Sequence, residues 1–385
     1  MINKKNISFS IVIIFLIFFS IECMLRIIFF TKNKIAKKEN AEWNYSDCEK
    51  ELVNIHEKNR ENVQKFGSFV QFSGDLYDLE KNKYYKPRPN SSIAVIRNEH
   101  IGHMSLLLDA EVSELLKDFN GEIYYKNFNE LSLRKTGREK LGDIAILALG
   151  DSFTEGCYVN DEDTFSAYLE RYGAKDGFKI NVFNAGIAGY NTPEEYFRFI
   201  DLIPDKKIDI LILSYFANDI NVSEHKVIGN WEPKEPQNEF GKWIFDNILV
   251  AGLIIEGYYS IFAKSLDPEK SKEVESGWQE SFHYLSKIKK ECDKNKVVFF
   301  LSAIPSKEHF AFNNTSFYQD KLKIFCDQEG IIFIDPYDYF KSRDIAKLYL
   351  DWDPHFTKEG HRIYGEYVYN QIKPVLKTIK MQISK

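Results

Sequence analysis

The sequence predicts an α/β fold, a three-layer α/β/α sandwich with a five-stranded parallel sheet, preceded by an N-terminal transmembrane helix. Three observations lead to this prediction. Short apolar segments alternate with amphipathic segments from residue 144 onward. A polar or glycine-containing turn ends each apolar segment, and an uncharged apolar run stands near the start of the chain. With 385 residues, the chain can bury one large core and still carry extensions.

The first expected element is a membrane helix. Residues 7–21 (ISFSIVIIFLIFFSI) carry no charge and present no polar face, and the apolar patch IIFF follows Arg26. Crossing a hydrocarbon core of about 30 Å takes about 20 residues, so the predicted span runs from Ile7 to about Ile28. Because no small-x-small cleavage site follows, we expect an uncleaved single-pass anchor rather than a signal peptide. Basic residues flank both ends of the run, so the positive-inside bias leaves its orientation open.

The expected anchor takes residues 1–30. The chain beyond it divides into a spacer, a lead-in and a main domain. Residues 31–80 are charged and polar with scattered apolar positions, which fits a helical spacer. Residues 81–140 hold β-rich stretches, YYKPRPNSSIAVI and EIYYKNFNELSLRK, and predict a small strand-rich lead-in. Residues 141–385 are the expected main domain. Its insertion at 222–272 contains FDNILVAGLIIEGYYSIFA, which we interpret as a helix packed on the sheet edge.

The main domain is expected to alternate strands and helices as parallel βαβ units do. The predicted strands are residues 144–149, 179–184, 208–214, 297–303 and 331–335. The predicted helices are residues 163–172, 193–202, 273–295, 317–328 and 358–377. In such a sheet, functional residues gather beyond the carboxyl ends of the strands.

Composition argues against nucleic acid and against a metal centre. The chain has 51 Lys and Arg against 57 Asp and Glu, and no basic patch interleaved with aromatic residues, so nucleic acid is not expected as a partner. The five cysteines are scattered and lack the CxxC or Cys/His spacing of a zinc site. We therefore expect no metal and no cofactor.

One serine stands where an α/β sheet presents a nucleophile. The segment ILALGDSFTEG at residues 146–156 places Ser152 after a strand and a glycine turn, where a helix would begin. Serine needs a base within hydrogen-bond reach to act as a nucleophile. His355, in DWDPHFTKEGH, is the candidate base, and Asp353 is the candidate carboxylate that orients it. Asp351 stays open as the alternative acid.

Acyl transfer also requires hydrogen-bond donors at the oxyanion that develops. The candidates are the backbone N–H of Ser152, the backbone N–H of Gly189 in NAGIAGYNT, and the side-chain amide of Asn218 in SYFANDI. Taken singly, Gly189 is equally explained as a turn glycine, Asn218 as a loop cap and His355 as a surface histidine. The order of the four segments favours a catalytic site.

These four ordered blocks resemble the SGNH, or GDSL, hydrolase superfamily over about residues 144–370. The anchor and the lead-in segment YKPRPN resemble its membrane-anchored bacterial branch. The resemblance implies a flavodoxin-like fold and ester hydrolysis or acyl transfer through an acyl-serine. Trp352 stands where an aspartate is common in the family, which leaves Asp353 or Asp351 as the acid. Phe216 stands where glycine is usual.

The expected function is a serine esterase that hydrolyses carboxylic esters, acetyl esters among them, on an envelope glycan or lipid. With its anchor in a membrane, the protein is expected to hold the catalytic domain in the periplasm or outside the cell. An O-acyltransferase with the same triad stays open, because acceptor choice depends on pocket solvation. A non-catalytic glycan-binding module stays open as well. A phosphate cradle at GDSFTEG is disfavoured by its acidic residues and by the missing P-loop lysine.

Overall fold

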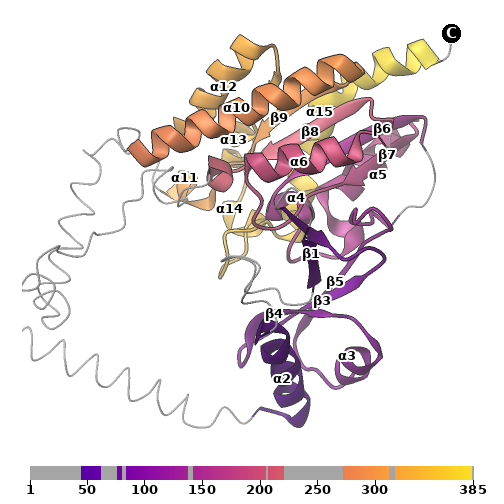
Figure 1. Ribbon diagram of the computed structural model, residues 1–385, viewed down its shortest axis with the longest axis vertical. Coiled ribbons are helices and arrows are strands. Elements are labelled where there is room, and N and C mark those ends of the chain that lie inside the picture. Colours follow the sequence, from indigo (N-terminus) through magenta and orange to yellow (C-terminus); the bar gives the residue numbers. More distant parts are fainter. Residues whose placement is uncertain are drawn as a thin grey trace, which may run out of the picture. The chain divides into compact units, whose positions relative to one another are not determined.

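A five-stranded parallel sheet forms the centre of the structure (Figure 1). Its strands lie in the order β10-β9-β8-β6-β7. They are β6 (Ile144–Gly150), β7 (Ile180–Asn184), β8 (Ile210–Tyr215), β9 (Val298–Ala303) and β10 (Ile332–Ile334). Because β6 pairs with β7 on one edge and with β8 on the other, the loops that follow these three strands meet beyond their carboxyl ends. The predicted α/β fold with a five-stranded parallel sheet is confirmed.

The described residues cover most of the chain and belong to one compact unit. The computed structural model describes residues 45–61, 76–79, 84–137, 142–204, 207–220, 272–311 and 317–383. The predicted membrane span from Ile7 to about Ile28 lies outside these residues, as does the predicted insertion except for residue 272. Across the described ranges, no helix combines the length and the apolar character that crossing a bilayer requires.

Alternating side chains of the strands build two cores, one on each face of the parallel sheet. Along β6, Ile146 belongs to the core under α5 (Phe165–Lys175) and α15 (Lys358–Ile383), whereas Leu147 belongs to the opposite core. The helices over that opposite core are α6 (Thr192–Leu202), α10 (Lys272–Asn295) and α12 (Phe317–Glu329). The period-two alternation of a buried strand therefore produces the three layers.

Short helical segments connect these elements. They are α4 (Ser152–Glu155), η4 (Asp161–Asp163), η5 (Ala217–Ile220), α11 (Lys307–Ala311), α13 (Tyr337–Lys341) and α14 (Ile345–Leu348). Helix α4 follows β6, η5 follows β8, and a turn after β7 leads into α6. These three connections lie at the carboxyl ends of neighbouring strands, where the sequence predicts the functional residues.

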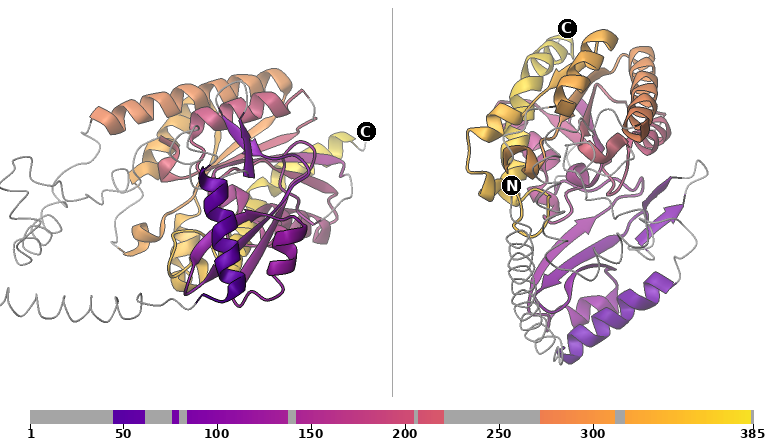
Figure 2. Two further views of the ribbon diagram at one scale, coloured as in Figure 1. Left: turned by 60° about the horizontal axis from the view of Figure 1, so that its bottom comes forward. Right: turned by 90° about the vertical axis from the view of Figure 1, so that its left-hand side faces the viewer.

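An antiparallel sheet precedes the parallel sheet in the chain. Its order is β4-β3-β5. Its strands are β3 (Ser92–Asn98), β4 (Gly102–Leu107) and β5 (Glu122–Asn127), and a separate pair is formed by β1 (Tyr77–Leu79) and β2 (Tyr85–Pro87). On one face, Ala94 and Leu106 pack in one cluster with residues of α2 (Asp47–Glu61) and α3 (Ala110–Leu115). Figure 2 shows both helices next to this sheet. Four of these strands, β2 to β5, fall within residues 81–140, where the sequence predicts a strand-rich lead-in.

Helix α2 differs in its packing from the predicted spacer. Its residues are helical, but Leu52 is fully buried in the same cluster as Ala94 and Leu106 of the antiparallel sheet. Strand β1, which also falls within residues 31–80, pairs with β2 of the lead-in. A few apolar positions among charged residues are enough to bury one helix face. The described part of residues 31–80 is thus packed on the lead-in.

Most elements differ slightly from their predicted bounds, and two of these differences have a physical reason. Strand β10 spans three residues rather than the predicted 331–335, as is common for a strand at a sheet edge. Helix α15 continues to Ile383, beyond the predicted end at residue 377, with Pro374 inside it. Ile372 and Leu376, on either side of Pro374, are fully buried, so tertiary packing holds the helix across the proline.

Candidate active site

The serine turn joins β6 to α4. Ser152 is the first residue of α4, and it is 8% exposed. The carboxylate of Asp151 caps the helix by accepting the backbone N–H of Phe153 at 2.9 Å. Gly150 has a φ of 148°, and a Cβ there would lie 2.3 Å from Oγ1 of Thr154, so the turn requires glycine. The strand end and the cap together hold the Ser152 hydroxyl at the carboxyl edge of the sheet.

The structure brings the three residues of the predicted triad together. Nε2 of His355 lies 2.6 Å from Oγ of Ser152, although the two residues are 203 positions apart. On the other side of the imidazole, Nδ1 is hydrogen-bonded to Oδ1 of Asp353, which also accepts the backbone N–H of His355 at 3.0 Å. Asp351 is exposed, and Asp353 is the carboxylate at the imidazole. This order of hydroxyl, imidazole and carboxylate is the arrangement that activates a serine.

The two aspartates nearest the imidazole have pKa values shifted in opposite directions. Burial acts to raise the pKa of Asp353, but the hydrogen bonds and charge of His355 outweigh it and hold that pKa below its ordinary value. Asp353 therefore stays ionised and can stabilise a protonated imidazole. Burial raises the pKa of Asp151 to about 6, although the N–H of Phe153, the charge of His355 and the side chain of Asn218 act to lower it.

The two other predicted oxyanion donors lie in the loops beside the serine turn. Gly189, with a φ of 79°, is in the turn after β7, and this turn is tied to the serine turn by the N–H of Ile187, which donates to the carbonyl of Gly150 at 3.1 Å. Asn218 is in η5 after β8, and its side chain is hydrogen-bonded to Asp151. The loops that carry Gly189 and Asn218 therefore border the serine turn from the two neighbouring strands.

Aromatic rings surround the imidazole of His355. The ring centroid of Phe153 lies 4.9 Å from that of His355, and that of Tyr158 lies 5.6 Å away. Phe216, one of the two departures from the family pattern, packs on Phe153, with the two ring centroids 4.4 Å apart. Trp352 is the other departure, and its ring centroid lies 4.8 Å from that of Tyr158. Large side chains thus occupy both positions and pack against the groups nearest the imidazole.

The lead-in sheet also reaches the loop that carries His355. The guanidinium of Arg97, in β3, lies 4.2 Å from the ring centroid of Trp352, within the range of a cation–π contact. His103, in β4, lies 5.7 Å from the same ring, and its charge acts to lower the pKa of Asp353. The antiparallel sheet therefore contributes side chains to the surroundings of the triad.

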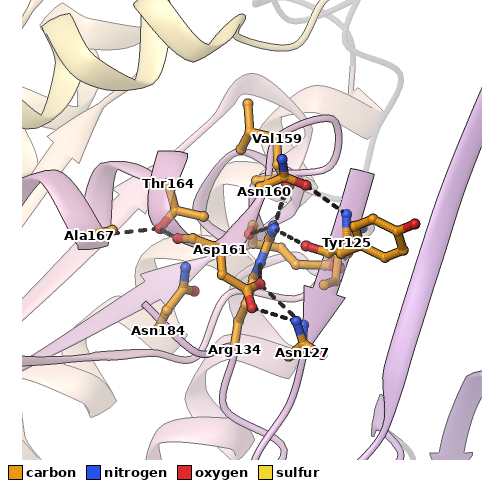
Figure 3. Close-up of polar contacts among 12 residues, drawn as sticks. Tyr125, Asn127, Arg134, Val159, Asn160, Asp161, Thr164, Ala167 and Asn184 are labelled. Carbon is orange, nitrogen blue, oxygen red and sulfur yellow. Dashed lines mark hydrogen bonds and ion pairs between the residues drawn. The ribbon is translucent and has the colours of Figure 1, made fainter. Parts of the chain in front are cut away.

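A buried arginine holds the end of α4 (Figure 3). Arg134 is 2% exposed, and its side chain donates to Asp161 at 3.1 Å and to the carbonyl of Val159 at 2.6 Å. It also donates to the carbonyls of Glu155 and Gly156. A cation at the C-terminal end of a helix satisfies the carbonyls that lack helical partners. Arg134 thereby fixes the segment that begins with the candidate nucleophile.

A second buried charge pair links the lead-in to the turn of Gly189. Nζ of Lys126, in β5, lies 2.7 Å from Oε1 of Glu155, and both side chains are almost fully buried. Oε2 of Glu155 accepts the backbone N–H of Ala188 at 2.6 Å. One carboxylate in the serine block thus binds the lead-in on one side and the residue before Gly189 on the other.

Two further buried carboxyls lie close to the candidate site on the opposite side. Neither oxygen of Glu195, in α6, has a hydrogen-bond partner among the described residues. Oδ2 of Asp219 accepts the N–H of Phe216 at 2.8 Å, and its Oδ1 has no partner within the described ranges. Burial, followed by the charges of neighbouring carboxylates such as Asp151, raises the pKa of both Glu195 and Asp219 well above the ordinary value.

The sequence motifs give no supporting role to Arg134, Lys126 or Glu155. Glu155 lies within GDSFTEG, and its place next to the serine is the one signal that singles it out. Arg134 and Lys126 stand in a polar stretch whose charges resemble those of an exposed strand. Their burial depends on partners in other elements, which the local pattern does not contain.

Solved structures with related folds are esterases and lipases of low sequence identity. A lipase/acylhydrolase from Enterococcus faecalis is 16% identical, with a TM-score of 0.37, and the match covers 60% of this chain and 96% of that chain. The psychrotrophic esterase EstA from Pseudoalteromonas sp. is 13% identical, with a TM-score of 0.37 and a coverage of 61% and 100%. AlinE4, an esterase of the SGNH-hydrolase family, is 15% identical, with a TM-score of 0.35 and a coverage of 63% and 98%.

Membership of a family rests on the sequence itself. No curated protein matches this chain at a significant level. The GDSL-like lipase/acylhydrolase family matches residues 148–363, which is more than half of the chain and includes Ser152, Gly189, Asn218 and His355. The protein therefore belongs to the GDSL-like lipase/acylhydrolase family and is an enzyme that hydrolyses ester bonds.

Proposed function

We propose that the protein is a serine esterase that removes acyl groups, acetyl among them, from a glycan or lipid of the cell envelope through an acyl-serine. The single observation that carries this proposal is the separation of 2.6 Å between Oγ of Ser152 and Nε2 of His355. The imidazole is held on its other side by Asp353. A hydroxyl within hydrogen-bond reach of an oriented base is what nucleophilic attack on an ester requires.

The proposed reaction has two halves that use the same groups. In the first, Oγ of Ser152 bonds to the ester carbonyl carbon while its proton passes to Nε2 of His355. The carbon–oxygen bond to the alcohol then breaks, and the alcohol leaves with that proton. In the second, a water molecule gives its proton to Nε2 and attacks the acyl-serine, and the proton returns to Oγ as the acid leaves. Asp353, which stays ionised, stabilises the imidazolium of each half.

The negative charge on the carbonyl oxygen is proposed to be stabilised by three donors. These are the backbone N–H groups of Ser152 and Gly189 and the side-chain amide of Asn218, which belong to the connections after three neighbouring strands. Donors that are fixed before the reaction lower the barrier without reorganising. In the structure the side chain of Asn218 is hydrogen-bonded to Asp151, which keeps its amide beside the serine turn.

The aromatic packing supports a short acyl group. Phe216 occupies the place where glycine is usual in the family, and its ring lies 4.4 Å from that of Phe153, which in turn lies 4.9 Å from His355. Space filled by these rings is not open to a long acyl chain. We therefore expect kcat/KM to be higher for p-nitrophenyl acetate than for the butyrate or octanoate ester, and a preference for octanoate would contradict the short-acyl proposal.

Ser152→Ala is the decisive variant. Without Oγ there is no acyl-serine, so ester hydrolysis should fall by at least about 10³-fold and labelling by a fluorophosphonate should disappear. Ser166→Ala is the matched control, because it also removes a buried serine hydroxyl, one with no hydrogen-bond partner among the described residues. It should keep both hydrolysis and labelling. A folded Ser152→Ala protein that hydrolyses ester at the rate of the parent, or a label mapped to another serine, would refute the assignment.

Hydrolysis and transfer are separated by the fate of the acyl group. As an esterase, the enzyme should release free acetate from an acetylated glycan or lipid at the same rate with and without an added sugar acceptor. As an O-acyltransferase, it should form an acylated sugar at the expense of free acetate. Mass spectrometry of both products distinguishes the two reactions, and acylated sugar as the main product would replace the esterase proposal.

We also propose that the chain is tethered to a membrane by residues 1–30, with the catalytic domain in the periplasm or outside the cell. The support is the uncharged run at residues 7–21. The full chain should then sediment with membranes and resist extraction by high salt, and a chain without residues 1–30 should not. Protease added to intact spheroplasts should cut the tethered domain if it faces outward. Full protection of the domain until lysis would contradict this orientation.

A further inference from the structure

The turn that carries Gly189 is held at both polar groups of Ala188. The backbone N–H of Ala188 donates to Oε2 of Glu155 at 2.6 Å. The carbonyl oxygen of Ala188 accepts a hydrogen bond from the phenol of Tyr85 at 2.7 Å. Tyr85 lies in β2, 103 positions earlier in the chain, within the YKPRPN segment. A side chain of the lead-in therefore holds the peptide group that joins Ala188 to Gly189.

That peptide group contains the proposed oxyanion donor. The carbonyl of Ala188 and the N–H of Gly189 belong to one planar unit, and the peptide is trans. In a trans peptide, the C=O and N–H bonds point in opposite directions, so a donor that fixes the carbonyl also fixes the direction of the N–H. A hydrogen bond to the carbonyl also polarises the N–H of the same group and makes it a better donor.

The turn lies close enough to the serine turn for this orientation to matter. A Cβ on Gly186 would lie 2.3 Å from the backbone nitrogen of Glu155, which shows how closely this loop approaches α4. The N–H of Ile187 donates to the carbonyl of Gly150 at 3.1 Å, two residues before Ser152. The loop that carries Gly189 is thus in direct contact with residues on both sides of Ser152.

Tyr85 is itself held firmly as a donor. Its ring packs edge-on against Tyr77 at 5.4 Å and against Tyr190 at 5.3 Å, and the phenol of Tyr190 donates to the carbonyl of Tyr85. Burial, followed by the carboxylates of Glu194 and Glu155, raises the pKa of Tyr85 well above its ordinary value. The phenol therefore keeps its proton at any pH at which the enzyme would work.

We propose that Tyr85 is a positioning residue of the active site, whose hydroxyl orients the Gly189 N–H toward the oxyanion by binding the carbonyl of Ala188. This inference rests on the proposed function, because it requires that Gly189 acts as an oxyanion donor. The side chain of Tyr85 touches neither substrate nor reacting atoms in this proposal. Its effect should appear in the transition state, where the oxyanion has formed, and not in the binding of substrate.

The experiment compares Tyr85→Phe with Tyr84→Phe. Each substitution removes one phenolic hydroxyl and keeps the aromatic ring. The phenol of Tyr84 is bonded to Asp201 in α6 and not to the turn of Gly189, so the second variant is a control for the loss of a tyrosine hydroxyl from the same segment. For each variant we would measure kcat and KM for p-nitrophenyl acetate, the melting temperature, and the affinity for a boronic acid, which forms a tetrahedral adduct with an activated serine.

For Tyr85→Phe, kcat should fall by about 10-fold with KM within about twofold of the parent, since a displaced donor costs less than a donor removed outright. The affinity for the boronic acid should fall by a similar factor. Tyr84→Phe should change kcat and boronic-acid affinity by less than about twofold, even if its melting temperature falls as much.

Three results would count against these proposals in different ways. If Ser152 is required for hydrolysis but Tyr85→Phe and Tyr84→Phe share the same kcat and the same boronic-acid affinity, the role of Tyr85 is overturned and the esterase proposal stands. If Ser152→Ala hydrolyses ester at the parent rate, both proposals are overturned together. A fall in kcat/KM of Tyr85→Phe that comes only from a raised KM, with kcat unchanged, would likewise refute positioning in the transition state.

Discussion

The serine turn has two sides that bury their charges in different ways. On the side of the lead-in, each buried cation has a buried anion within hydrogen-bond distance. Lys126 lies 2.7 Å from Glu155, and Arg134 lies 3.1 Å from Asp161. On the side of α6 and η5, Glu195 is fully buried without a hydrogen-bond partner among the described residues.

The difference teaches which part of the site responds to pH. On the lead-in side, each buried charge faces an opposite charge, and the pairs hold backbone groups in place. The pKa of Glu195 and that of Asp219 are raised, first by burial and then by neighbouring carboxylates, so these groups bind protons in the folded state that they would release when unfolded. Charge pairs therefore support the serine turn on the side of the lead-in, and the raised pKa values of Glu195 and Asp219 make stability depend on pH on the side of α6 and η5.

Arg134→Met should have the largest effect on stability. It leaves the carboxylate of Asp161 buried without its cation and the carbonyls of Glu155 and Gly156 without the donor that Arg134 supplies, so the free energy of unfolding should fall by about 3–5 kcal/mol. Arg362→Met is the control, because Arg362 pairs with Glu359 and Glu366 near the surface and should cost no more than about 1 kcal/mol. Urea unfolding followed by circular dichroism measures both. Equal losses would mean that burial does not distinguish the two arginines.

The pair of Lys126 and Glu155 should show strong coupling. Lys126→Met leaves the carboxylate of Glu155 buried without its cation, and we expect a loss of about 3 kcal/mol; Glu155→Gln leaves Lys126 in the same position. The double variant removes both charges, so its loss should be smaller than the sum of the single losses by about 1–3 kcal/mol. Additive losses in the double-mutant cycle would show that the two side chains stabilise the fold independently.

Glu195→Gln should have an effect that depends on pH. The folded-state pKa of Glu195 lies above its unfolded value of about 4.3, so the carboxyl destabilises the fold increasingly as pH rises from about 4, at up to about 1.4 kcal/mol per pH unit. Glu195→Gln removes this cost, so its advantage in the free energy of unfolding should grow between pH 4 and pH 7.

Asp353→Asn is the matched contrast, because its pKa is shifted the other way. A lowered folded-state pKa contributes stability above the unfolded value of about 3.9, and this stability is lost as pH falls through the folded value. Asp353→Asn should therefore be less stable than the parent near neutral pH, and the difference should vanish in acid. Differences that run parallel for Glu195→Gln and Asp353→Asn would rule out the proposed charge states.

Much of the fold and of the triad could be predicted, because both depend on contiguous segments. The five apolar segments that were predicted as strands form the five strands of the parallel sheet. Ser152, Gly189 and Asn218 each follow one of three adjacent strands, so parallel pairing alone brings them to one edge. The sequence also predicts a helical spacer over residues 31–80, and residues 47–61 are helical, but their burial against the lead-in was not predicted.

The supporting residues could not be predicted, because their partners are distant in the chain and their local pattern is that of a polar surface. Lys126 pairs with a residue 29 positions away, and Tyr85 binds the carbonyl of a residue 103 positions away. Periodicity indicates which side chains face a core, but it does not identify the buried charges that find a partner there.

Residue patterns along the chain were therefore sufficient to predict the class of fold and to select Ser152 and His355 as the candidate nucleophile and base. Three contacts became evident only in the folded structure. The imidazole of His355 binds Asp353 and not Asp351, Arg134 donates to the end of α4, and Tyr85 donates to the turn of Gly189. The physical reason is that hydrogen bonds of fixed length and direction depend on coordinates, whereas apolar burial depends mainly on composition and period.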